Sequence, residues 1–135
     1  MAKRLTTILL TTFILSAIIT TIVMAIMFAQ EPSDTNKNPY ISGMAYGIAW
    51  MIIISIAIFT TTIYLNLYKK IRNNYFYSAL TFLSFPLFIM ISFITSLGGF
   101  AQGWKMYGAI SLPYFFILIF HFLKYRKYLK HMPLV

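Results

Sequence analysis

The sequence contains no cysteine and only two acidic residues, and only 10% of its 135 residues are charged. The absence of cysteine excludes disulfide bonds, thiolate metal ligands and thiol nucleophiles, and it leaves the redox compartment undetermined. The shortage of charge is equally informative, because a soluble domain carries about 25% charged residues. A soluble fold therefore fits this chain poorly.

Apolar surface, in contrast, is abundant, because 60% of the residues are hydrophobic. A small soluble domain leaves much of its surface in water, so one core cannot hide this much apolar material. A lipid bilayer is the solvent that suits such a composition.

Four long uncharged runs follow one another along the chain, and we expect each to form a transmembrane helix. About 20 apolar residues span the hydrocarbon core as a helix, which satisfies its own backbone polar groups within lipid. The predicted helices cover residues 5–29, 41–68, 74–97 and 105–124, with approximate ends. The sequence thus predicts an all-α integral membrane protein, in which residues 1–135 form a single transmembrane domain, a compact antiparallel bundle of four helices.

The first run has a second interpretation as a secretory signal, because the basic start MAKR precedes it. Such signals have an apolar run of about 7–15 residues, and this run is well beyond that length. Cleavage after Ala29 would also place Met27 at a position that prefers a small residue. We therefore expect a true membrane helix.

The basic residues are distributed unevenly over the segments that join the predicted helices. If the chain crosses four times, nine of the eleven lie on one side, and the other side holds Lys37 and Lys105 with both acids, Glu31 and Asp34. The nine are Lys3, Arg4, Lys69, Lys70, Arg72, Lys124, Arg126, Lys127 and Lys130. Because cytoplasmic loops carry the excess of Lys and Arg, we expect a multi-pass protein of the cytoplasmic (inner) membrane with both termini in the cytoplasm.

The net charge of +9 would suggest a nucleic-acid partner in a soluble protein. Here the basic residues lie where topology requires them and where they meet lipid headgroups. We therefore expect the lipid bilayer, with anionic lipid on the cytoplasmic side, and no nucleic acid as the partner of this charge.

Groups that could carry chemistry are scarce. Apart from Lys105 and Lys124 at the two ends of the fourth run, no Asp, Glu, Lys or Arg lies within the apolar runs. Proton-coupled export usually relies on a buried ionisable residue, so it is not expected. His121 is the sole histidine in a span, and no carboxylate or cysteine accompanies it. We expect no enzyme, no catalytic residue, no metal site and no cofactor. His121 is then an interfacial histidine or, with an ordinary pKa of about 6.5, a pH-sensitive group.

The third predicted helix carries its hydroxyl groups on one face. At 100° per residue they share a sector of about 120° with two phenylalanines. This hydroxyl face consists of Ser78, Thr81, Ser84, Phe85, Phe88, Ser92, Thr95 and Ser96. Small polar residues favour close packing between membrane helices, so the first interpretation is a helix interface. The alternative is a polar path through the membrane, which the two phenylalanines would obstruct or gate.

Two glycines and two prolines within the predicted helices are also of interest. Gly43 and Gly47 form a GxxxG pair in the second helix, which predicts close packing against another helix. Pro86 and Pro113 lie inside the third and fourth helices and predict kinks. The two kinks fall at similar depth in an antiparallel hairpin, where they either nest or open a small cavity.

Two functions remain open at this point. The first is a small bacterial membrane protein that binds another membrane protein or itself, as an accessory subunit or as an immunity protein against a membrane-inserted toxin. The second is an oligomeric ion channel or membrane-permeabilising effector. The hydroxyl face, the two prolines at similar depth and the nine basic residues on the cytoplasmic side support this alternative.

Overall fold

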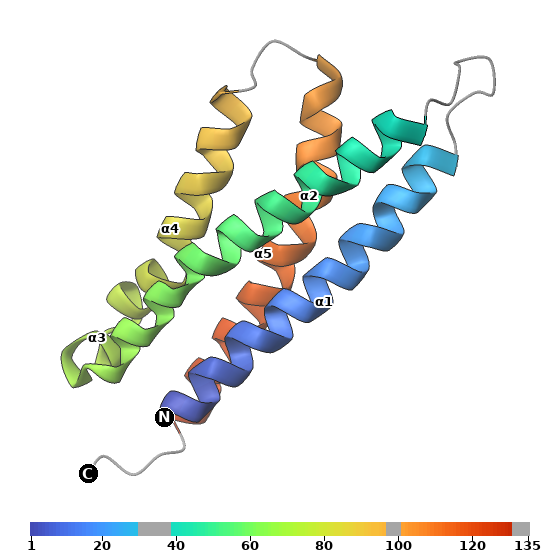
Figure 1. The fold of residues 1–135 in the computed structure, drawn as a ribbon. Helices are drawn as coiled ribbons and strands as arrows, with labels where there is room; N and C mark the ends of the chain where they lie inside the picture. Colours follow the sequence, from blue (N-terminus) through green and yellow to red (C-terminus); the bar gives the residue numbers. More distant parts are fainter. Residues whose placement is uncertain (30–38, 97–100, 131–135) are drawn as a thin grey trace.

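The computed structural model describes residues 1–29, 39–96 and 101–130, and these residues are almost wholly helical. The elements are the α-helices α1 (Ala2–Ala29), α2 (Pro39–Thr60), α3 (Lys69–Asn73), α4 (Tyr75–Ser96) and α5 (Ala101–Lys130), with a 3-10 helix η1 (Thr61–Leu67) that continues α2. Figure 1 shows their arrangement.

Four segments are long and apolar enough to cross a membrane, which confirms that part of the fold prediction. They are Ala2–Ala29, Gly43–Leu67, Tyr75–Ser92 and Tyr107–Lys130. The second combines α2 with η1, so one span contains two kinds of helix.

Two features of the chain differ from the predicted boundaries. α5 continues to Lys130, six residues beyond the predicted end at 124, because Lys, Arg and Leu favour helix even where hydropathy falls. The connection after the second span also contains a short helix, α3, that hydropathy did not predict. Asn74 ends the turn after α3, and its side-chain Oδ1 accepts a hydrogen bond from the Phe76 amide at the start of α4.

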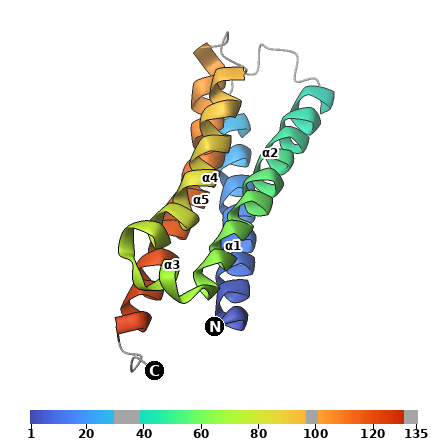
Figure 2. The ribbon, with the colours of Figure 1, turned by 90° about the vertical axis from the view of Figure 1, so that its left-hand side faces the viewer.

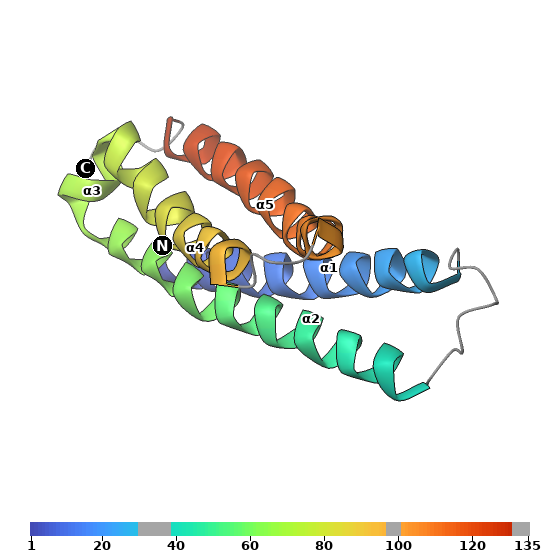
Figure 3. The ribbon, with the colours of Figure 1, turned by 90° about the horizontal axis from the view of Figure 1, so that it is seen from above.

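α1 begins and α5 ends at the same end of the molecule, beside α3 (Figure 1). We call this the basal end and the opposite one the distal end. α1 makes its largest interface with α5, and α4 contacts both α2 and α5. The four long helices, which Figure 3 shows from above, all contribute buried side chains to one interior.

Aromatic side chains fill the basal half of that interior. The Phe82 ring centroid lies 5.1 Å from that of Phe122 and 5.6 Å from that of Tyr125, and all three side chains are buried. Ile53 and Ile56 of α2 complete this core. Toward the distal end α2 leans away from α4, as the views in Figures 1 and 2 agree.

Pro86 and Pro113 lie inside α4 and α5, and both helices continue through them. Neighbouring helices and hydroxyl side chains can satisfy the carbonyl groups that proline frees in a membrane helix. The kinks and their matched depth stay a prediction.

Candidate functional site

The hydroxyl face of α4 divides into a covered basal half and an uncovered distal half. Ser78 and Thr81 are buried in the basal half. The Thr81 hydroxyl donates to the Ser78 carbonyl at 2.8 Å and accepts a hydrogen bond from Asn66 Nδ2 at 2.6 Å. This half of the face is a helix interface, held by polar contacts.

Asn66 reaches this interface because η1 is a 3-10 helix. With three residues per turn, positions i and i+3 lie on the same side, so Ile63 and Asn66 both face inward and are fully buried. Asn66 Nδ2 also donates to the Ile63 carbonyl at 3.1 Å, and the Thr62 hydroxyl donates to the Thr81 carbonyl at 2.8 Å. No role for Asn66 was predicted from the sequence, although it is the one amide side chain in the second predicted helix.

Two further polar contacts join the helices, and the sequence did not single them out either. The buried Tyr114 hydroxyl of α5 donates to the Thr60 hydroxyl of α2 at 2.9 Å. The Thr20 hydroxyl of α1 donates to the Ile110 carbonyl of α5 at 3.2 Å. Hydrogen bonds of this kind stabilise contacts between membrane helices.

The distal half of the hydroxyl face has no cover within the described chain. Phe85 is 47% exposed and Phe88 is 66% exposed. Ser84 and Thr95 donate their hydroxyl protons to carbonyls of their own helix, those of Leu80 and of Ile91 and Ser92. Ser92 is half-buried, and the side chain of Ser96 lies outside the described ones.

Among the described residues, no helix packs against the glycine pair of α2, so the predicted close packing is not made by this part of the chain. Gly43 and Gly47 are exposed, and a Cβ atom added at either would meet nothing within 4 Å. The reason is the helical period, because Ala49, Ile52, Ile53 and Ile56 turn the opposite side of α2 toward the core.

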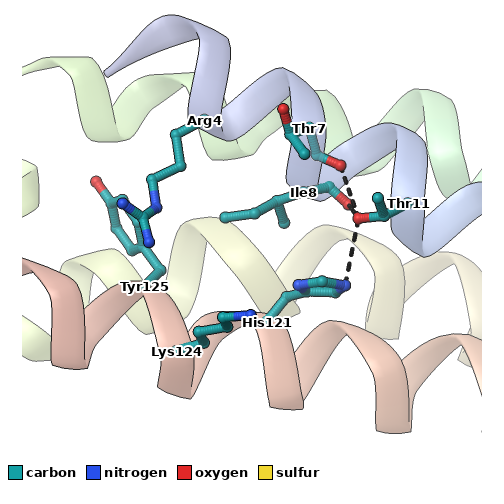
Figure 4. A pocket seen from close by; sticks show the side chains of 7 residues that line it. All are labelled: Arg4, Thr7, Ile8, Thr11, His121, Lys124 and Tyr125. Atoms are coloured by element: carbon teal, nitrogen blue, oxygen red, sulfur yellow. Dashed lines mark hydrogen bonds between the residues drawn. The ribbon is translucent and has the colours of Figure 1, made fainter.

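His121 lines a pocket between the basal ends of α1 and α5. The pocket has a volume of about 370 Å³ and is lined by Arg4, Thr7, Ile8 and Thr11 of α1 and by His121, Lys124 and Tyr125 of α5. Figure 4 shows Thr11 and His121 facing each other at one end and Arg4 beside Tyr125 at the other. The α1 residues and the α5 residues of the pocket lie more than a hundred positions apart in the sequence, so the sequence did not predict that they meet.

The His121 side chain has a defined partner. Its Nε2 lies 3.3 Å from the Thr11 hydroxyl, which donates its single proton to the Thr7 carbonyl at 2.7 Å (Figure 4). This contact joins the His121 ring of α5 to α1. Among the described residues, no group of three or more His, Cys, Asp or Glu side chains could hold a metal ion.

Arginine side chains link the helices around the same end. The Arg4 guanidinium lies over the Tyr128 ring, 3.4 Å from its centroid. Arg126 Nη1 donates to the Arg72 carbonyl at 2.8 Å, which ties α5 to α3. The buried Tyr125 hydroxyl, which lies in the electrostatic range of Arg72, Arg126 and Arg4, has no hydrogen-bond partner in the described part of the chain.

Comparison with known proteins gives no further guide to function. No family model matches the sequence. No curated protein and no solved structure matches it either. The four membrane-spanning helices, the divided hydroxyl face and the basal pocket are therefore the observations from which a function must be inferred.

Proposed function

We propose that this chain is a multi-pass protein of the cytoplasmic membrane that acts by binding another membrane protein through the uncovered distal half of α4. An accessory subunit and an immunity protein against a membrane-inserted toxin both act in this way. The partner surface is a transmembrane helix that packs against Phe85 and Phe88.

The charge distribution supports the orientation in this proposal. α1 begins, α3 lies and α5 ends at the basal end, and these three segments carry the nine basic residues of one side. An excess of Lys and Arg marks the cytoplasmic side of a membrane protein, so the basal end and both termini are cytoplasmic. The distal half of α4 then lies in the outer half of the membrane.

The single observation that carries the binding proposal is the exposure of one end of a face whose other end is buried. Ser78 and Thr81 show that this face of α4 packs against a helix where one is available. Phe88, two turns farther along from Thr81, is 66% exposed, and no described residue covers it. A partner helix seated there continues the packing that η1 provides at the basal end.

A channel formed by several copies is the second candidate. One copy has its interior filled by Ile53, Ile56, Phe82, Tyr114 and Leu118 in the described residues. An ion path would therefore form between copies, with the distal hydroxyl face turned inward. Ser92 would line such a path and Phe88 would narrow it.

Site-specific photo-crosslinking tests the binding proposal. A benzophenone amino acid replaces Phe88 in the intact protein, and the matched control carries it at Phe120 of α5, which is 64% exposed against 66% for Phe88. We expect a defined cross-linked membrane protein from position 88 and only lipid adducts from position 120. Equal cross-linking at both positions would refute a docking face on α4.

Conductance in liposomes that contain only this protein separates the two candidates. The binding proposal predicts no conductance, both for the natural chain and for Ser92→Leu. A conductance that Ser92→Leu abolishes, together with a cross-linked product of doubled mass from position 88, would favour the channel and sink the binding proposal.

A further inference from the structure

We propose that the basal pocket between α1 and α5 is a binding site for the phosphate of an anionic phospholipid headgroup. Arg4, His121 and Lys124 line it with positive or protonatable groups, and Thr7 and Thr11 add hydroxyls. None of the described residues is Asp or Glu, so none of them brings a negative side chain to this pocket. A bound phosphate supplies the missing negative charge.

Arg4 is held in position for such a ligand. Its guanidinium carbon lies over the Tyr128 ring, 3.4 Å from the centroid, which holds the group in place. Stacking uses the face of the guanidinium and leaves its N–H groups, which lie along the edge, free to bind phosphate oxygens. Arginine binds phosphate well in this geometry because two parallel N–H groups match two oxygens.

Thr11 is a positioning residue for His121. The Thr11 hydroxyl, fixed by its own bond to the Thr7 carbonyl, lies 3.3 Å from His121 Nε2, and their hydrogen bond sets the direction of the ring. Figure 4 shows the ring lying along the wall of the pocket between Thr11 and Lys124. His121 and Lys124 of α5 therefore line the same cavity as Thr7 and Thr11 of α1.

Tyr125 lines the pocket and is 1% exposed, and its ring also packs against Phe82 of α4, with the two ring centroids 5.6 Å apart. The pocket therefore borders the core of the bundle.

The surface above the pocket points to a lipid rather than to a free phosphate ion. The face of α1 that carries Thr7 and Thr11 continues, at helical spacing, through Leu15, Ile18 and Ile22. These three side chains are 46%, 53% and 54% exposed. This face of α1 thus carries hydroxyl groups near the basal end and apolar side chains farther from it. The first part suits a lipid headgroup, and the second suits its acyl chain.

Lipid affinity of the full chain in detergent tests this inference. Native mass spectrometry compares dioleoylphosphatidylglycerol, dioleoylphosphatidylcholine and inorganic phosphate on the natural chain and on the double variant Arg4→Gln/Lys124→Gln. The matched control is Lys3→Gln/Lys127→Gln, which removes the same charge from exposed positions on the same two helices outside the pocket. We expect phosphatidylglycerol to bind about tenfold more weakly to Arg4→Gln/Lys124→Gln, because charge-assisted hydrogen bonds are lost. Its affinity for the control variant should equal that for the natural chain.

Three other outcomes would overturn the inference. An equal loss in both pairs means diffuse attraction of anionic lipid to the basic end. Equal binding of phosphatidylcholine means that the anionic headgroup is not recognised. Competition by inorganic phosphate at the affinity of the lipid means a site for the free ion.

The positioning role of Thr11 has its own readout. Thr11→Val should weaken phosphatidylglycerol binding and Thr11→Ser should restore it, whereas Thr21→Val on the same helix should have no effect. Should the Arg4 variant fail to fold, a photoreactive phosphatidylglycerol on the natural chain decides instead. Labelling confined to segments 4–11 and 121–125 supports the site, and labelling spread over the bundle contradicts it.

Discussion

Asn66 Nδ2 lies 2.6 Å from the Thr81 hydroxyl, and this contact joins the 3-10 end of the second span to the base of the third. Both residues are buried, and no acidic or basic side chain takes part. The contact holds η1 against the basal half of the hydroxyl face of α4, which is buried. The exposed half of the face begins beyond it.

Replacement of Thr81 by Val should destabilise the fold by about 1 kcal/mol, because the Asn66 amide then loses one of its two acceptors. Val keeps the shape of Thr, so packing changes little. Reversible unfolding in mixed micelles measures the difference. Thr95→Val on the exposed part of the same helix is the control and should change stability by a few tenths of a kcal/mol at most. Equal losses of stability in Thr81→Val and Thr95→Val would show that the Asn66–Thr81 contact contributes nothing.

The two halves of α4 should also differ in their tolerance of lost volume. Phe82→Ala removes a ring that contacts Phe122 and Tyr125 and should cost about 3 kcal/mol. Phe88→Ala should leave the stability of the isolated chain nearly unchanged, because Phe88 is 66% exposed. Unfolding curves of the two variants in the same detergent make the comparison. A large loss at Phe88 would mean that another segment covers it.

Gly47→Ala should stabilise the isolated chain by up to about 1 kcal/mol, because alanine favours helix and the added methyl group meets nothing within 4 Å. Thermal unfolding in detergent measures the gain. The same variant compared in a bilayer reports on the surroundings of α2. A loss of stability there, beside a gain in detergent, would reveal a helix packed against Gly47 in the membrane.

The proposed topology predicts that single cysteines placed at Ser33 and Asn73 react with impermeant thiol reagents from opposite sides of the membrane. The natural chain has no cysteine, so it serves as its own blank. Asn73 ends α3 at the basal end and should label only from the cytoplasm. Labelling of both positions from one side would contradict four crossings.

Hydropathy was enough to predict the four spans, because a helix in lipid needs only length and apolar composition. It could not predict which half of the hydroxyl face is covered, since the exposure of Phe85 and Phe88 depends on the angle between α2 and α4. The inward position of Asn66 could not be predicted for a different reason. A helical wheel assumes 3.6 residues per turn, whereas η1 has three. The Thr11–His121 contact joins two ends of the chain, and periodicity along one helix carries no information about such a pair.

The change of pitch at Thr61 also affects how this span fits a bilayer. A 3-10 helix rises about 2.0 Å per residue against about 1.5 Å for an α-helix, so the seven residues of η1 lengthen the span by about 3.5 Å. Conversion of η1 to α-helix would shorten it by that amount and turn Asn66 away from Thr81. Bilayer thickness and the Asn66–Thr81 contact are therefore coupled, and we expect thicker membranes to strengthen the contact and thinner ones to weaken it.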